Sequence, residues 1–279
     1  GIIDKLLLTR CVRDSTAYMV VLIIVQQLFN LAIIAWQGVE VVYPWSLLAL
    51  LAGGLQVGLW YSYLKALQVE EVSRVTSLVF VYPLFVFLGA ALLLGESLTT
   101  ANYLGGLLLV SSAMLVSRRP SPAGPLAFSP AVKPLIVFWI AASAYAIAAK
   151  HLLLHMDEWQ LILWSAFGNL ALVLPFLIVP RIREEVFIFS RQGARVMGAV
   201  LLEETFDLAG RAGMIFAFAL GSVGLVSSVS ALQPLMVLLY VVVLSIFVPG
   251  LLEEELDRHS IMRKLAAVVM VSLGIYLIS

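Results

Sequence analysis

Uninterrupted apolar stretches of about 20 residues dominate this 279-residue chain and decide what it can fold into. An α-helix needs a run of about that length to cross the hydrocarbon core of a bilayer. Hydrophobic residues make up 62% of the chain and charged residues only 12%, so a water-soluble fold would leave much apolar surface uncovered. The runs do not alternate as the strands of a membrane barrel do. The sequence therefore predicts an all-α, polytopic helical bundle whose first partner is the lipid bilayer.

Nine segments are predicted to cross the membrane as helices, and most of the loops between them are short. We expect an integral, multi-pass protein of the cell membrane, meaning a plasma or inner membrane. The predicted spans are residues 15–37, 44–66, 71–94, 98–117, 132–154, 158–180, 195–220, 222–248 and 261–279.

A linker rich in proline and glycine divides the chain into two hydrophobic blocks. Residues 118–131 hold four prolines and one glycine, a density that is typical of a loop. We therefore predict a first repeat at residues 1–117 and a second at 132–279. A shift of 151 residues sets Pro83 against Pro234 and brings similar apolar and hydroxyl residues into register. Chance matching among apolar letters is the alternative.

A second match suggests that the first block lacks one helix. Residues 5–8 (KLLL) resemble residues 151–154 (HLLL), which end the first helix of the second block. The start of the chain would then correspond to the end of a helix, and nine spans would belong to a ten-helix, five-plus-five arrangement. Because five is odd, the second copy would be inverted in the membrane.

Positive charge is distributed unevenly over the predicted loops. Of the 17 Lys and Arg residues, 15 lie on one set of alternating loops, Lys150 lies on the other set, and Arg211 lies inside a helix. The positive-inside rule makes the charged set cytoplasmic and places the C-terminal Ser279 on the opposite side. The 15 residues are Lys5, Arg10, Arg13, Lys65, Arg74, Arg118, Arg119, Lys133, Arg181, Arg183, Arg191, Arg195, Arg258, Arg263 and Lys264.

A series of short motifs runs through the second half of the first block. They are Tyr63–Leu67 (YLKAL), Glu71–Ser77 (EVSRVTS), Tyr82–Leu84 (YPL), the turn Leu94–Thr99 (LGESLT) and the pair Gly105–Gly106. These motifs resemble the EamA-type repeat of the drug/metabolite transporter superfamily. The second block is similar more weakly, through residues 219–228 and Pro234, and its acidic turn is stretched over Leu251–Asp257. The resemblance implies two inverted five-helix halves and alternating-access export or exchange of small organic solutes. The charge distribution departs from the cytoplasmic termini that the family usually has.

The predicted span 195–220 carries charge where a bilayer makes charge costly. Glu203, Asp207 and Arg211 are spaced at i, i+4 and i+8, and Glu204 lies beside them on the same stripe. A charge at the bilayer centre costs about 2.5–3.5 kcal/mol on insertion scales, so these side chains should face the bundle interior or a watery cavity. Such carboxyls could carry protons or hold a cationic substrate. An internal Asp207–Arg211 ion pair is the structural alternative, and a segment that does not span is another.

Polar and aromatic residues elsewhere add candidates for a substrate site. The repeat aligns Gln56 with Asp207 and Trp60 with Arg211, so we expect the four positions to converge at a central site. Gln56 could hydrogen-bond a substrate, and Trp60 could stack on it or on a cation. Ordinary packing is the alternative for Trp60, and bridging between helices is the default for Asn169.

Matched prolines mark the two blocks. Pro83 and Pro234 break the helical hydrogen-bond ladder at corresponding positions, and we predict that they are symmetric hinges. Packing kinks without motion would explain them equally well.

Several functional classes lack support in the sequence. The net charge is zero, which argues against nucleic-acid binding, and Cys11 is the only cysteine. The three histidines show no metal-ligand spacing, and no nucleotide loop or nucleophile–base arrangement is present. We therefore predict a secondary transporter of small organic solutes, with protons as one possible coupling ion and without enzyme activity or cofactor. The alternative is a non-transporting membrane scaffold or assembly subunit with a salt-bridged core.

Overall fold

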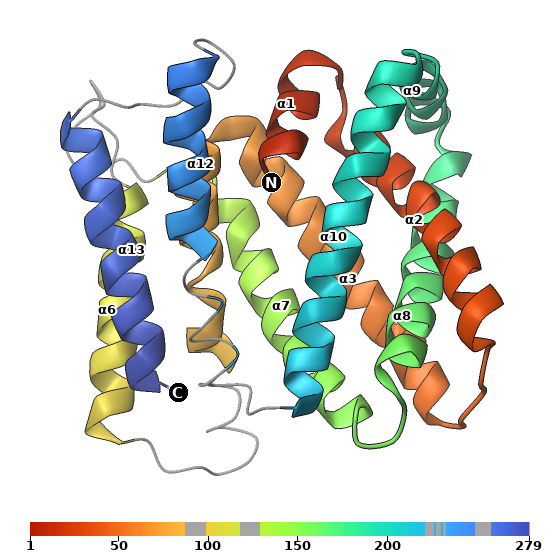
Figure 1. Ribbon diagram of the computed structural model, residues 1–279, viewed down its shortest axis with the longest axis horizontal. Coiled ribbons are helices and arrows are strands. Elements are labelled where there is room, and N and C mark those ends of the chain that lie inside the picture. Colours follow the sequence, from red (N-terminus) through yellow and green to blue (C-terminus); the bar gives the residue numbers. More distant parts are fainter. Residues whose placement is uncertain are drawn as a thin grey trace.

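The computed structural model is a bundle of helices, and no β-strand occurs in the part of the chain that it describes (Figure 1). It describes residues 1–86, 99–117, 129–220, 226, 230, 233–248 and 258–278. The predicted linker 118–131 and the acidic turns Leu94–Thr99 and Leu251–Asp257 lie wholly or largely outside these residues. The all-α polytopic architecture predicted from the sequence is confirmed.

Most described helices match a predicted span to within a few residues at each end. The helix α10 matches the charged span, and α9 falls in the basic stretch between two spans. The elements are α1 (Ile2–Arg10), α2 (Ser15–Gln37), α3 (Trp45–Val69), α4 (Val72–Val79), α6 (Thr100–Ser117), α7 (Val132–Leu152), α8 (Glu158–Val173), the 3-10 helix η1 (Leu174–Ile178), α9 (Pro180–Ser190), α10 (Ala194–Leu220), α12 (Gln233–Phe247) and α13 (Arg258–Ile278).

Five of the described helical stretches are long and apolar enough to cross a membrane by length and composition. They are Ser15–Gln37, Trp45–Val69, Val132–Leu152, Glu158–Ile178 and Arg258–Leu277. Three shorter apolar helices, Val72–Val86, Thr100–Leu115 and Gln233–Phe247, accompany them. At 27 residues α10 is long enough to span but is not among the five, because four of its ionisable residues fall within nine positions.

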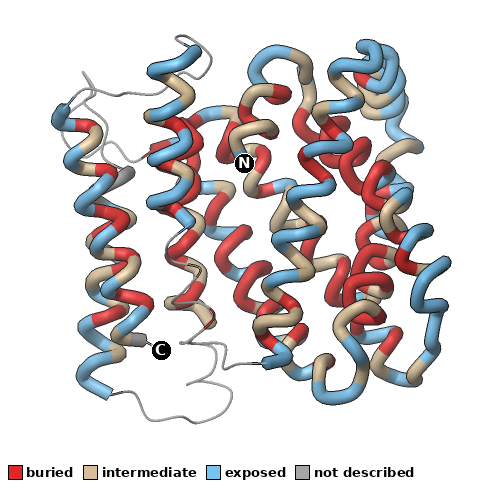
Figure 2. The backbone as a smooth tube through the Cα atoms, in the orientation of Figure 1, coloured by how far each residue is buried: buried red, intermediate tan, exposed pale blue. Residues whose placement is uncertain are grey.

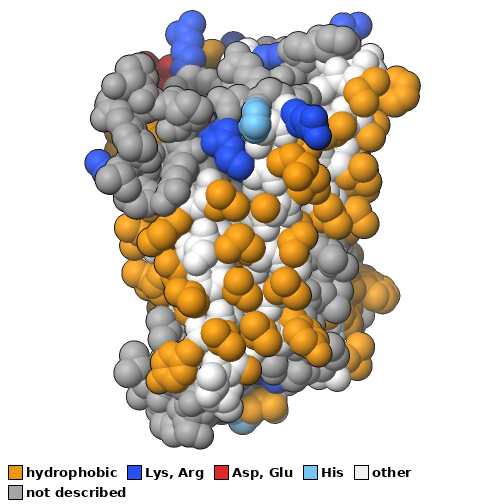
Figure 3. Space-filling view, turned by 90° about the vertical axis from the view of Figure 1, so that its left-hand side faces the viewer, with side chains coloured by type: hydrophobic (Ala, Val, Ile, Leu, Met, Phe, Trp, Pro, Cys, Tyr) orange, Lys and Arg blue, Asp and Glu red, His pale blue; other side chains and the backbone are white. Residues whose placement is uncertain are grey.

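The outside of the bundle is apolar over much of its height. The exposed residues include large hydrophobic side chains such as Leu31, Leu107, Ile140 and Val269. Figure 3 shows hydrophobic side chains over the middle of one face, with Lys and Arg mainly toward its upper end. A soluble protein rarely exposes so much contiguous apolar surface, whereas lipid covers it at no cost. The protein is therefore an integral, multi-pass membrane protein.

The core is centred on α3, which packs along both α7 and α8. Figure 2 shows buried positions along these helices, whereas α10 and α13 carry many exposed ones. The crossing of α3 and α8 is close because glycines face each other's helix. A Cβ atom on Gly53 would lie 2.0 Å from the carbonyl oxygen of Ser165, and one on Gly168 would lie 1.9 Å from that of Leu50. Small residues allow such backbone approach between helices in membranes.

At the other side of the bundle, α6 packs along α13, and α4 contacts α12. The pairs α6–α13 and α2–α8 join helices that the predicted repeat makes equivalent, and the members of each pair run in opposite directions (Figure 1). The division into two repeats stays a prediction.

The basic stretch 181–195 largely forms a short helix. The span 158–180 loses α-helical geometry at Leu174, where Pro175 begins the 3-10 turn η1, and Pro180 then opens α9. Proline is tolerated at these first helical positions because it has no N–H to donate. Arg181, Arg183 and Arg191 lie on or beside α9, as expected for a segment at the membrane surface.

The helix that contains Pro83 is interrupted just before it. Helix α4 ends at Val79, and helical structure resumes from Tyr82 to Val86 after a turn. Proline clashes with the carbonyl four residues earlier, here Val79, so an interruption is expected there. The carbonyls of Leu78 and Tyr82 accept hydrogen bonds from the Trp139 indole (2.8 Å) and the Ser143 hydroxyl (2.9 Å) of α7. The neighbouring helix thus braces the break.

Candidate functional site

Charged residues of α10 lie in the interior as the sequence predicts. Glu203 and Glu204 are each only 5% exposed, although most of α10 is exposed or half-buried. Asp207 and Arg211 form an ion pair one turn apart, with Oδ2 and Nε separated by 2.5 Å. One carboxylate oxygen of Glu203 and one of Glu204 have no hydrogen-bond partner within the described chain. The two glutamates therefore differ from Asp207, which has an ion-pair partner on its own helix.

A fourth acid, Asp4 of α1, joins this cluster and was not predicted. Asp4 is fully buried, and its Oδ1 accepts a hydrogen bond of 3.0 Å from the hydroxyl of Tyr18 on α2. Its Oδ2 pairs with the amino group of Gly1 at 2.5 Å. Asp4 lies close enough to Glu203, Glu204 and Asp207 to repel each of them electrostatically. The signal in the sequence was its position one residue before the basic Lys5, which made it resemble a surface loop charge.

Polar side chains from α2 surround the Asp207–Arg211 pair. With its amide oxygen turned toward α10, Gln26 accepts a hydrogen bond of 2.8 Å from the Arg211 guanidinium. Tyr145 of α7 also lies within electrostatic range of Arg211 and Asp207. Two other helices, α2 through Gln26 and α7 through Tyr145, therefore lie against the ion pair of α10, which favours the structural interpretation of Asp207 and Arg211.

The two predicted amides Gln56 and Asn169 meet each other. Both are buried, and the Asn169 side chain donates to Gln56 Oε1 across 2.9 Å, bridging α8 and α3. This bridge lies one turn from Gly53 and directly after Gly168, at the close helix crossing. Tyr145 lies beside Gln56 as well as near Arg211, so the amide pair and the ion pair share one neighbour.

Trp60 and the two prolines lie apart from the acids. The Trp60 ring is half-buried and meets Tyr63 edge to face at 6.0 Å, and Tyr63 in turn lies near Phe138. No described contact joins Trp60 to α10. Pro83 follows the braced break after α4, whereas Pro234 is the second residue of α12, where proline fits without breaking a bond.

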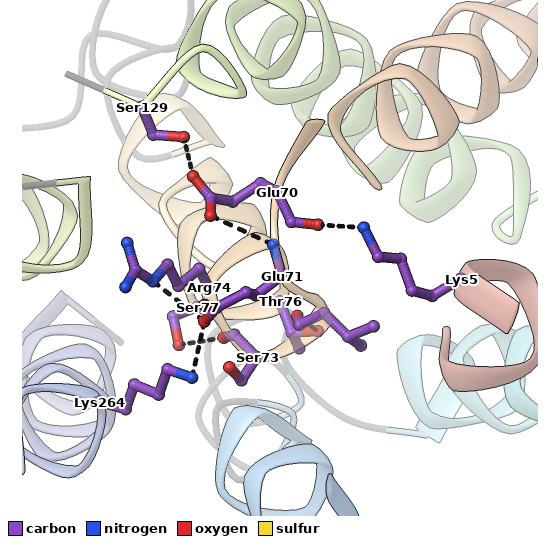
Figure 4. Close-up of polar contacts among 10 residues, drawn as sticks. Lys5, Glu70, Glu71, Ser73, Arg74, Thr76, Ser77, Ser129 and Lys264 are labelled. Carbon is purple, nitrogen blue, oxygen red and sulfur yellow. Dashed lines mark hydrogen bonds and ion pairs between the residues drawn. The ribbon is translucent and has the colours of Figure 1, made fainter. Parts of the chain in front are cut away.

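A second polar cluster occupies the turn between α3 and α4, at the charged end of the bundle (Figure 4). Glu71 accepts from Lys264 of α13 at 2.7 Å and from Arg74 at 3.1 Å. Arg74 and Lys264 are each only 3% exposed. Charges this deeply buried must be paired, because the unpaired ion would be strongly destabilised.

The same turn is tied to two further segments. The Glu70 carboxylate accepts hydrogen bonds from the Ser129 hydroxyl and from the backbone N–H of Glu71. The Lys5 ammonium of α1 donates to the carbonyls of Leu67 (2.7 Å) and Glu70 (2.8 Å), which end α3. The sequence predicts Lys5 on a cytoplasmic loop and Ser129 in the linker. They instead form a buried junction of the first block, the second block and the segment before α7.

Metal chemistry finds no support in the described residues, among which no three His, Cys, Asp or Glu side chains form a candidate site. The histidines His151 and His155 pack around Trp45, and the His155 ring stacks on it at 3.6 Å.

The fold and the buried acids define the class of protein, which is a multi-pass membrane protein with ionisable side chains in its interior. Comparison with known families adds to this. Residues 6–118 match the model of the EamA-like transporter family. The match lies in the first block and confirms the resemblance predicted from the motifs there.

Other comparisons bear on the fold. No curated protein matches the chain significantly by sequence. A solved crystal structure of another protein superposes with a TM-score of 0.58 at 17% sequence identity, covering 100% of this chain and 96% of that one. At such low identity the match establishes a shared fold along the whole length and nothing about substrate.

Proposed function

We propose that the protein is a secondary active transporter that moves small organic solutes by alternating access around a central, partly acidic site. The observation that carries this proposal is the pair of glutamates on α10, each buried with an unpartnered carboxylate oxygen. Ionisable residues inside membrane helices are costly, and they commonly mark substrate or proton pathways. The EamA-like match of residues 6–118 supports the same class.

The motion would rest on the predicted inverted repeat. Equivalent helices pair across the bundle, α2 with α8 and α6 with α13, which supports two halves that rock against each other. The interruption before Pro83 and the start of α12 at Pro234 are the proposed hinge positions. The end that carries α9 and the α3–α4 turn would face the cytoplasm by the positive-inside rule.

Proteoliposomes with a pH-sensitive dye inside test both transport and proton coupling. The probes are the twenty standard amino acids, benzylamine, benzoate and benzyl alcohol, each added outside at the same concentration. We expect at least one probe to change the internal pH in wild-type vesicles. Glu203→Gln and Glu204→Gln should abolish this change, and Glu184→Gln on the exposed face of α9 should not. Proton movement that is unchanged in both Glu203→Gln and Glu204→Gln would contradict a role of these glutamates in proton coupling.

A non-transporting scaffold or assembly subunit is the second candidate. The buried ion pairs Asp207–Arg211 and Glu71–Lys264 favour it, since paired charges hold helices together without motion. This candidate predicts that no probe enters the vesicles, as measured by the radiolabelled solute itself. Uptake of any probe that saturates with concentration would contradict it.

A further inference from the structure

Two of the four acids in the core have a buried carboxylate oxygen without a hydrogen-bond partner in the described part of the chain. Arg211 pairs with Asp207, and the Tyr18 hydroxyl donates a hydrogen bond to Asp4. Glu203 and Glu204 are the acids without such a partner in the described chain, and each is 95% removed from solvent. Arg211 attracts Glu204 electrostatically, but Asp4 and Asp207 repel both glutamates, so a positive charge bound at the two glutamates would stabilise them.

Phenol rings lie near these carboxylates, and no three His, Cys, Asp or Glu side chains among the described residues form a candidate metal site. Tyr18 of α2 and Tyr63 of α3 both lie within electrostatic range of Glu203, and Tyr18 is also within range of Glu204. Tyr63 continues into the aromatic contacts with Trp60 and Phe138. A bare metal ion prefers several converging oxygen or nitrogen ligands, whereas an ammonium group combines carboxylate hydrogen bonds with aromatic faces.

A surface pocket leads toward the same residues from the charged end. It has a volume of about 100 Å³, and its lining includes Asp14, Glu185, Phe189 and Tyr18. The Tyr18 ring meets Phe189 of α9 edge to face at 5.6 Å, and its hydroxyl reaches inward to Asp4. Tyr18 therefore separates the pocket from the acids, and the pocket lining itself holds Asp14 and Glu185 together with Arg13.

We propose that Glu203 and Glu204 bind the positively charged nitrogen of a small organic amine, and that the pocket beside Tyr18 is its approach from the charged end. This inference rests on the proposed transport function and names the class of its substrate. The apolar part of the amine packs against Tyr18 and Tyr63, and its N–H groups donate to the two free carboxylate oxygens.

Three probes of matched shape test the charge preference in purified, detergent-solubilised protein. Benzylamine is cationic, benzyl alcohol is neutral and benzoate is anionic, and equilibrium dialysis measures the binding of each. We expect saturable benzylamine binding that is at least tenfold tighter than that of the other two. Methylammonium and spermidine extend the panel, so that an amine of a different size is not missed.

Glu203→Gln and Glu204→Gln should each weaken amine binding at least tenfold, and the double variant should abolish it. Glu203→Asp should keep part of the affinity, because it keeps the charge, and Glu184→Gln on α9 should bind as the wild type does. Size-exclusion elution checks that each variant is folded. Equal binding of benzoate and benzylamine, amine binding in the double variant, or no glutamate-dependent binding of any amine would each overturn the inference.

Different results would contradict the proposed transport and the proposed substrate class. Amine binding without amine uptake into proteoliposomes would support the cation site and contradict the transport function. Saturable uptake of benzoate or a neutral probe, without amine binding, would support the transport function and contradict the amine as its substrate.

Discussion

Lys264 and Glu71 form a buried ion pair of 2.7 Å that ties the last helix to the turn between α3 and α4. Lys264 belongs to the second predicted block and Glu71 to the first, so the pair links the two blocks at the charged end (Figure 4). Glu70 and Lys5 extend the junction toward Ser129 and α1. These contacts hold segments of both predicted blocks together at that end of the bundle.

Lys264→Met should lower the free energy of unfolding by about 3–5 kcal/mol, because it removes the ammonium group that pairs with the buried Glu71 carboxylate. Denaturant titration in mild detergent micelles, followed by tryptophan fluorescence, measures the change. Arg258→Met on the exposed start of the same helix is the control and should change stability by less than about 0.5 kcal/mol. Equal effects of the two substitutions would show that the pair contributes nothing specific.

Much of the fold follows from the sequence because bilayer length and apolar runs leave few choices. The helices α2, α3 and α7 begin and end close to the predicted bounds. The α8 helix ends before the predicted span 158–180 does, because Pro175 and Pro180 change the backbone locally. Hydropathy averaged over a long apolar segment does not reveal two prolines near its end.

The candidate site was predictable in part. The charges inside the predicted span 195–220 identified Glu203, Glu204 and the Asp207–Arg211 pair, because ionisable side chains that face lipid are costly. The partners that come from other helices, such as Asp4, were not predictable. Their contacts depend on which faces of the helices pack against each other. A helix that is apolar on every side has no periodic pattern in its sequence that would identify its packing face.

The charged turn shows the same limit more sharply. Glu70, Glu71 and Arg74 resemble an ordinary cytoplasmic loop in the sequence, and the structure buries all three. Burial comes from α1 and α13, which are distant in the chain and supply Lys5 and Lys264. Only the complementary charges could have hinted at the pairing.

Gly53→Ala and Gly168→Ala should each destabilise the protein by about 3 kcal/mol or more. The new Cβ atoms would meet backbone carbonyls, which cannot move as side chains can, so α3 and α8 must separate. Separation would also strain the Gln56–Asn169 hydrogen bond. Thermal unfolding followed by fluorescence provides the measurement.

Gly210→Ala on α10 is the matched control for the glycine prediction. Nothing lies within 4 Å of a Cβ atom built on Gly210, and alanine favours a helix by about 0.5–1 kcal/mol over glycine. This variant should be as stable as the wild type or more so. If all three alanine variants unfold alike, the close crossing of α3 and α8 is not what requires glycine.

Trp139→Phe should cost about 1–3 kcal/mol, because the buried Leu78 carbonyl loses the indole N–H that satisfies it at the break before Pro83. The phenyl ring keeps most of the contact with Phe85, whose ring stacks on Trp139 at 5.6 Å. Trp36→Phe at the exposed end of α2 is the control. Equal stability of the two variants in denaturant would mean that α7 does not brace the break.

Asp14, the N-cap of α2, should make stability depend on pH in the acid range. Its Oδ1 accepts from the Thr16 N–H at 2.8 Å, and Arg181 lies 3.6 Å from its Oδ2. Burial raises the pKa of Asp14, but the Thr16 hydrogen bonds and the charges of Lys65 and Arg181 outweigh it and hold the pKa below its ordinary value.

A carboxyl whose pKa is lower in the folded state stabilises the protein above its unfolded pKa of about 4, and the contribution is lost as the pH falls through the folded pKa. Asp14→Ala should therefore cost about 0.5–2 kcal/mol at pH 7 and progressively less toward pH 3. Asp14→Asn keeps a capping oxygen but cannot titrate, so the difference between wild type and this variant isolates the charge. Unfolding measured in half-unit steps from pH 7 to pH 3 should show that difference shrinking. A difference that stays constant over the whole range would mean that the Asp14 charge does not stabilise α2.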